Sequence, residues 1–61
     1  MSDRSQLARP APNTIVWVHE PNKAVRQGRF RRAMLGNLWA IWMGGEEYAW
    51  VDSQSVRLAP P

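Results

Sequence analysis

Five basic residues stand close together in the middle of this 61-residue chain, with no acidic residue among them. They fall between positions 22 and 35 and are Lys23, Arg26, Arg29, Arg31 and Arg32. Arginine binds phosphate and carboxylate groups through a planar fork of N–H donors, and it also stacks on flat rings. A basic cluster attracts phosphate oxygens by its field and by direct hydrogen bonds. The segment therefore predicts a contact surface for a phosphate-bearing or carboxylate-bearing partner.

Three of the four tryptophans follow this basic segment, at Trp39, Trp42 and Trp50. A core built from so few residues cannot hold all three rings. Trp39 and Trp42 are three positions apart, so on a strand they face opposite sides, and Trp50 precedes Val51, which we expect to point inward. We expect Trp42 or Trp50 to be exposed, where it can stack on a base or join a protein interface. All three tryptophans join the five basic residues as predicted binding residues.

Residues that could support catalysis are few. His19 is the only histidine and there is no cysteine, so neither a zinc site nor a thiolate nucleophile is expected. Glu46 and Glu47 are adjacent, and neighbouring strand residues point to opposite faces. Gly44-Gly45 lacks the helix and lysine that accompany a phosphate-binding loop. We therefore expect a protein that is not an enzyme, with no catalytic residue, metal or cofactor.

The whole chain permits one small domain. A chain of 61 residues is near the lower size limit for an unaided hydrophobic core, and self-association is a common remedy. No apolar stretch approaches the roughly 20 residues of a membrane helix. The start is polar and proline-bearing, unlike a signal peptide. We expect a cytoplasmic protein with a flexible tail over 1–13 and one domain over 14–61.

The apolar pattern predicts short strands separated by turns. Residues 14–19 are β-branched and aromatic and stop at Pro21. Residues 28–35 have the length of a strand between two glycines, although their helix propensity leaves a short helix open. As a strand, this run sets Arg29, Arg31 and Ala33 on one face and Phe30, Arg32 and Met34 on the other. Strands over 38–43 and 46–51 follow, joined by Gly44-Gly45. Such strands favour an all-β fold, a small bent sheet closed into a barrel.

The closing stretch, Trp50 to Leu58, breaks over four polar residues and then resumes as a strand. Asp52 and Ser53 can cap a short turn through their side-chain oxygens. We expect one turn of 3₁₀-helix over 52–55 and a closing strand from Val56. Val51, Val56 and Leu58 are expected to point inward.

This ending resembles that of SH3 domains, in which an aromatic-aliphatic pair, a 3₁₀ turn and a Val-x-Leu strand follow one another. Residues 38–51 are similar to the SH3 hairpin with its tryptophan-bearing strand. The resemblance implies an SH3-like barrel of about five short strands over 14–60. Trp39 matches the ligand-binding tryptophan of those domains. Asp52 and Ser55 replace the proline and tyrosine of their peptide-binding platform, so the resemblance extends to the barrel and not to that platform.

Two further groups are similar. Integrase C-terminal and Tudor- or KOW-type modules share the size and the basic, tryptophan-bearing surface, which often meets nucleic acid. Plasmid-borne trimethoprim-resistant dihydrofolate reductases resemble residues 27–29 and 47–49. Their pore-lining Gln-Ile-Tyr is replaced by Arg57-Leu58-Ala59.

The sequence thus leaves three functions open. The first is a non-catalytic module, of a kind that suits a phage or plasmid accessory protein, which docks on a protein partner or self-associates through tryptophan and arginine. The second is a nucleic-acid-binding domain that uses residues 23–32. The third, a minor alternative, is a pore-type reductase.

Overall fold

A computed structural model of the protein describes residues 9–61. These residues form five antiparallel strands and one turn of 3₁₀-helix. The strands are β1 (Ile15–Val18), β2 (Arg26–Ala33), β3 (Leu38–Gly44), β4 (Glu47–Asp52) and β5 (Val56–Arg57), and the 3₁₀ turn η1 (Ser53–Ser55) precedes β5. The predicted all-β fold is confirmed. The strand prediction for 28–35 is also confirmed, although the strand begins and ends two residues earlier.

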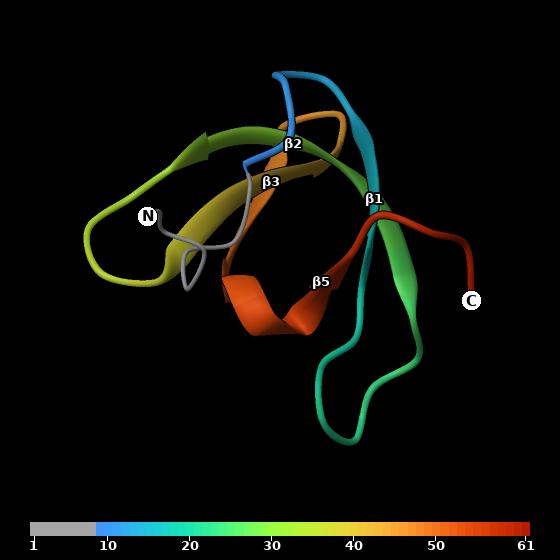
Figure 1. The fold of residues 1–61 in the computed structure, drawn as a ribbon. Coiled ribbons are helices and arrows are strands. Elements are labelled where there is room, and N and C mark those ends of the chain that lie inside the picture. Colours follow the sequence, from blue (N-terminus) through green and yellow to red (C-terminus); the bar gives the residue numbers. More distant parts are fainter. Residues whose placement is uncertain (1–8) are drawn as a thin grey trace.

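The sheet has the order β4-β3-β2-β1-β5, so β4 and β5 are its two edges. Its central strands β2 and β3 are long and strongly curved, and η1 carries the chain from one edge strand to the other (Figure 1). Strands β1 to β4 are linked in sequence by hairpins, whereas β5 pairs out of sequence with β1. In the part that the structure describes, no helix is long and apolar enough to cross a membrane.

Glycines at two turns adopt a backbone conformation that other residues avoid. The β3–β4 turn has φ values of 121° at Gly44 and 54° at Gly45, and the β2–β3 turn has 71° at Gly36. Positive φ values carry little steric cost for glycine. The two-glycine hairpin predicted between β3 and β4 is therefore confirmed.

The core lies on the concave face of the sheet. Val16, Val18, Ile41 and Val51 are buried there, together with the pair Phe30 and Trp39. The rings of that pair meet edge to face, with centroids 5.0 Å apart and planes at 77°. This is a favoured geometry for aromatic pairs, and the large rings supply much of the apolar area that a small domain must bury.

A β-bulge in β2 corrects the predicted faces of that strand. Phe30 pairs with Ile41, but the next pair is Arg32 with Ala40, so Arg31 is the extra residue. A bulge shifts the side-chain alternation by one position. Arg31 and Arg32 therefore both lie outside the core, whereas Ala33 packs against it. The predicted grouping of Arg31 with Ala33, and of Arg32 with Phe30, was wrong because the sequence carries no sign of the bulge.

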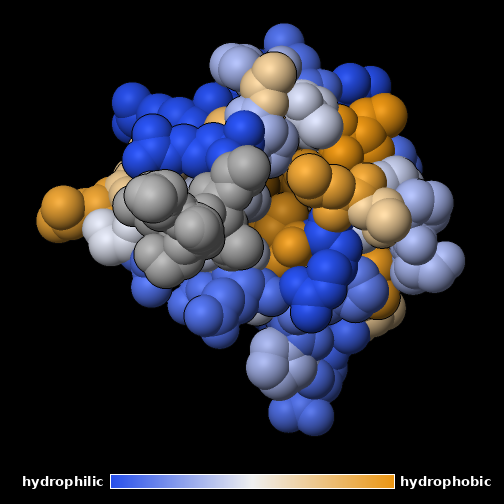
Figure 2. Space-filling view, viewed as in Figure 1, coloured by the Kyte–Doolittle hydropathy of each residue, from blue (hydrophilic) through white to orange (hydrophobic). Residues whose placement is uncertain are grey.

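The closing stretch behaves as predicted except at its end. Asp52 is the N-cap of η1, and its Oδ1 accepts a hydrogen bond from the Gln54 amide at 2.8 Å. Val51 and Val56 are buried as expected. Leu58 was predicted to point inward and is instead 56% exposed. The chain leaves the sheet after Arg57, since β5 has only two residues, and hydrophobic side chains reach the surface near β5 and the C-terminus (Figure 2).

Candidate binding face

Aromatic and basic side chains lie in two rows on the convex side of β2, β3 and β4, which we call the outer face. Register places Arg32, Ala40 and Trp50 side by side in the first row. The second row contains Arg29, Trp42 and Tyr48. Because the side chains of a strand alternate, these residues stand opposite the core residues of the same strands. Each row thus has an arginine of β2 at one end and an aromatic ring of β4 at the other, with a residue of β3 between them.

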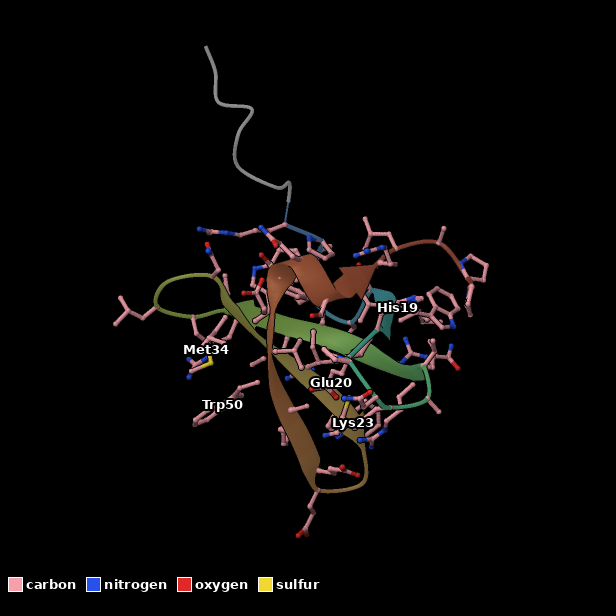
Figure 3. The ribbon with its side chains drawn as sticks, turned by 90° about the horizontal axis from the view of Figure 1, so that it is seen from below. His19, Glu20, Lys23, Met34 and Trp50 are labelled. Carbon is pink, nitrogen blue, oxygen red and sulfur yellow. The ribbon has the colours of Figure 1, made fainter. Side chains whose placement is uncertain are left out.

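The small Ala40 leaves a hollow of about 360 Å³ in the first row. Its lining consists of Arg31, Arg32, Met34, Ala40, Tyr48 and Trp50. Ala40 is only 6% exposed, because larger side chains surround it. Figure 3 shows Met34 and Trp50 projecting on one side of the molecule, with His19, Glu20 and Lys23 across from them. The hollow is therefore lined by two guanidinium groups together with the side chains of Met34, Ala40, Tyr48 and Trp50.

The aromatic side chains of this face are open to solvent to different degrees. Trp50 is 68% exposed and Tyr48 is 55% exposed. Trp42 is half-buried, and its Nε1 donates a hydrogen bond to the Gly45 carbonyl at 2.8 Å. The predicted exposure of Trp50 is confirmed, and Trp42 lies on the face opposite Trp39 as its spacing indicated. Large exposed aromatic surface is rare on a domain of this size and typically marks a contact site.

Acidic partners neutralise part of the basic segment. Arg26 Nη2 lies 3.0 Å from Glu47 Oε2, across from β2 to β4. Lys23 Nζ lies 3.9 Å from Glu20 Oε1 within one loop. Glu20 is half-buried and the other three side chains are solvent-exposed, and ion pairs near the surface contribute about 0–1 kcal/mol to stability. These ion pairs therefore add little to the stability of the fold, but they weaken the electrostatic attraction of Lys23 and Arg26 for a phosphate group.

Arg29 and Arg31 hold Asn13, which lies two residues before β1. Arg29 Nη1 donates to the Asn13 carbonyl at 3.0 Å, and Arg31 Nη1 donates to Asn13 Oδ1 at 2.7 Å. Asn13 also donates its backbone N–H to the Phe30 carbonyl at 2.7 Å. Asn13 belongs to the predicted tail over 1–13, of which residues 1–8 lie outside the described part. Through these contacts, two of the five basic residues of the segment, Arg29 and Arg31, help to hold the fold together.

Arg32 differs from the other basic residues of the segment. Within residues 9–61 it has no ion pair and no side-chain hydrogen bond. It is exposed beside the hollow, next to Ala40 in the register. No residue of the described part therefore takes up any of the five N–H donors of its guanidinium group.

The structure divides the predicted binding residues into three groups. Arg31, Arg32 and Trp50 line the hollow, and Arg29 and Trp42 lie in the neighbouring row. Arg26 and Lys23 lie outside the hollow in ion pairs. Trp39 is 7% exposed in the core, so it does not present its ring to a partner.

Sequence reasoning missed Tyr48, Met34 and Ala40 as members of this face. Tyr48 is two residues before Trp50, and this spacing alone places both rings on one side of a strand. Ala40 could not be recognised in the same way, because a hollow depends on the larger neighbours that surround a small residue. Met34 follows β2 beyond the bulge and lines the hollow from there.

The remaining polar candidates do not converge. In residues 9–61, no three side chains among His, Asp and Glu come together as potential metal ligands. His19 is half-buried, and its Nε2 is buried with no hydrogen-bond partner among the described residues. Glu46 and Glu47 are both exposed, as expected of a hairpin tip, and among the described residues only Glu47 forms a salt bridge.

Comparison of the chain with protein-family models, curated proteins and solved structures finds no match.

Proposed function

We propose that this protein is a non-catalytic, SH3-like binding module that docks on a partner protein through its outer face. The SH3-like assignment is supported by the 3₁₀ turn before the last strand and by the tryptophan-bearing hairpin of β3 and β4. The docking role rests on one observation, the hollow over Ala40 between the Trp50 ring and the Arg32 guanidinium.

Tryptophan and arginine are both enriched among the residues that contribute most to binding at protein interfaces. Tryptophan buries a large area with few rotatable bonds, and arginine adds both apolar and charged contact. The hollow gives a partner side chain somewhere to insert, as buried anchor residues require. Self-association through the same face is the second form of this proposal, because small domains often gain stability from a second copy.

Nucleic-acid binding is the second candidate. It is supported by the guanidinium groups of Arg31 and Arg32 beside the exposed Trp50 ring, which could hold a phosphate and stack on a base. It is less favoured because four of the five basic residues are already engaged by Glu20, Glu47 and Asn13. A pore-type reductase, the minor alternative, has no feature of the outer face in its support. A cytoplasmic location stays a prediction.

Affinity capture from lysate of the source organism, with quantitative mass spectrometry, tests the docking role. We expect a partner that the wild type retains and Trp50→Ala or Arg32→Ala loses. Leu58→Ala and Lys23→Ala are matched controls, since both residues are exposed and outside the hollow, and these variants should retain the partner. Equal capture by all variants would refute docking through this face.

Two solution measurements test the alternatives to docking on a partner protein, which are self-association and nucleic-acid binding. Light scattering of the wild type and Trp50→Ala tests self-association, which predicts a concentration-dependent dimer only in the wild type. Polarisation titrations with single-stranded and duplex oligonucleotides at two salt concentrations test the second candidate, which predicts salt-dependent binding that Arg32→Ala weakens. Absence of binding at low salt would rule out that candidate.

A further inference from the structure

Within residues 9–61 the sheet has two edges, β4 and β5, and only β4 is long enough to receive another strand. β4 has six residues and β5 has two. An edge strand presents unpaired backbone N–H and C=O groups, which an extended chain can satisfy by adding a strand. β5 is followed by a bend and two prolines, and proline has no N–H to donate.

The ladder shows which backbone groups of β4 remain open. The Ser53 amide donates to the Asn37 carbonyl at 2.8 Å, in the same register as the β3–β4 pairs. In an antiparallel ladder, hydrogen-bonded pairs alternate with pairs whose N–H and C=O groups point away from each other. Ala49 and Val51 therefore bond to β3, whereas the backbone groups of Tyr48 and Trp50 point to the open edge.

The same two residues place their side chains on the outer face. Tyr48 and Trp50 thus offer both an exposed ring and an open backbone pair. A strand that hydrogen-bonds to them sets its own alternate side chains on the outer face, against these rings. Main-chain bonds would provide affinity and the rings would provide selectivity, as in other cases of strand addition.

The charges along the edge indicate the chemistry of the partner strand. Glu46 precedes β4 and Asp52 ends it, and within residues 9–61 neither forms an ion pair. Both are exposed. Opposite charges directly across a strand pair are stabilising and like charges are destabilising. A second copy of this chain could in principle add its own β4 to the edge. The register that sets Tyr48 opposite Trp50 of that copy also sets Glu46 opposite its Asp52. Like charges would then face each other at both ends of the strand pair, so charge disfavours this self-pairing.

We propose that the β4 edge receives an extended segment of a partner protein, with apolar side chains at alternate positions and a basic residue at each end. This inference rests on the proposed docking role of the outer face and names the partner chemistry and the mode of contact. In the antiparallel register, the basic residues lie opposite Asp52 and Glu46, and the apolar residues lie opposite Trp50 and Tyr48.

The probe for this proposal is the capped peptide Lys-Thr-Val-Thr-Val-Thr-Lys, whose two valines are the apolar positions. Titration into the full chain, followed by tryptophan fluorescence and by NMR amide shifts, is expected to give saturable binding in the millimolar range or below. Replacement of both lysines by glutamate should weaken binding three- to tenfold, since two opposite-charge pairs become like-charge pairs. An unchanged affinity for the glutamate peptide would overturn the partner chemistry.

Backbone N-methylation of the probe tests the mode of contact with a matched control. Methylation of the first valine removes a donor that points to Trp50 and should weaken binding about tenfold or more. Methylation of the central threonine removes a donor that points away from β4 and should leave affinity within about twofold. Equal effects of the two methyl groups, or no binding at millimolar probe, would overturn strand addition.

The edge itself is tested at Asp52, whose φ of −65° is compatible with proline. Asp52→Pro and Asp52→Ala both lose the carboxylate and its cap bond to the Gln54 amide. Only the proline variant also loses the backbone N–H of residue 52, which points to the open edge like those of Tyr48 and Trp50. We expect the proline variant to bind the probe at least threefold more weakly than the alanine variant. Equal affinity of the two variants would count against the edge at this position.

If Trp50→Ala weakens binding while the N-methyl peptides behave alike, docking through the outer face survives and strand addition fails.

Discussion

Trp39 and Trp50 lie one register step apart on the β3–β4 hairpin, yet they belong to two different environments. Trp39 is 7% exposed and packs on Phe30, whereas Trp50 is 68% exposed beside the hollow. The difference arises from strand alternation, since the two residues point to opposite faces of one sheet. The inner face of these strands holds the molecule together, and the outer face leaves similar rings available for contact. Substitutions on the two faces should therefore separate stability from binding.

The largest effect is expected for Trp39→Ala. Removal of a buried tryptophan ring leaves a cavity in a small core and costs about 3–5 kcal/mol, which is comparable to the stability of a domain of this size. Urea or thermal unfolding followed by circular dichroism measures the loss, with Trp50→Ala as the matched control. A Trp39→Ala protein as stable as the wild type would contradict the assignment of this ring to the core.

Gly28→Ala is the next largest. A Cβ at Gly28 would lie 2.6 Å from Ile41 Cγ2 and 2.9 Å from the Trp42 carbonyl oxygen. The backbone cannot yield as a flexible side chain would, so overpacking should cost about 1–3 kcal/mol. Gly36→Ala is the control, because that position is open and only its φ of 71° opposes a side chain, at roughly 1 kcal/mol. Equal unfolding midpoints for the two variants would argue against a close approach at Gly28.

Asn13 tests whether the arginines of β2 serve the fold. Asn13→Gly removes the side-chain acceptor of Arg31 but keeps a residue that tolerates the φ of 71°, so we expect a loss of about 0.5–1.5 kcal/mol. Asn13→Ala adds backbone strain and should lose about 1 kcal/mol more. Chemical denaturation measures both. If the glycine variant is as stable as the wild type, the bond from Arg31 to Asn13 does not stabilise the fold, and Arg31 is available to bind a partner.

The smallest effect on stability is expected for Trp50→Ala. An exposed ring contributes little to a folded monomer, so the change in unfolding free energy should stay within about 0.5 kcal/mol. The same variant should lose partner affinity about tenfold or more, because tryptophan anchors carry much of an interface. Unfolding and affinity capture on one preparation check both expectations. A strongly destabilised Trp50→Ala protein would show that this ring contributes to the packing of the core and would contradict its assignment to a contact surface.

Much of the fold follows from local sequence patterns. The β-branched run before Pro21, the glycines at 44 and 45 and the polar break at 52–55 each mark an element that the structure confirms. Leu58 shows the limit of such patterns. An apolar residue after a strand looks inward-facing, but β5 is too short to hold it against the core.

The binding face was harder to predict than the fold. The exposure of Trp50 followed from its neighbour Val51, because alternation is a local rule. The partners of Arg26 and Arg31 were not predictable, since Glu47 and Asn13 are 21 and 18 residues away in sequence. The bulge at Arg31 also left no local sign. A run of charge in a sequence therefore does not reveal which of its members remain available to a ligand.

Amide hydrogen exchange along β4 tests most directly that this edge and its outer face are the contact surface. In the free protein we predict slow exchange at Ala49 and Val51 and fast exchange at Tyr48 and Trp50, because only the latter amides point away from β3. Addition of the lysine-ended peptide should slow exchange at Asp52, whose amide also points to the open edge, and at the two ring-bearing residues Tyr48 and Trp50. Unchanged exchange at these two amides on binding would contradict the account.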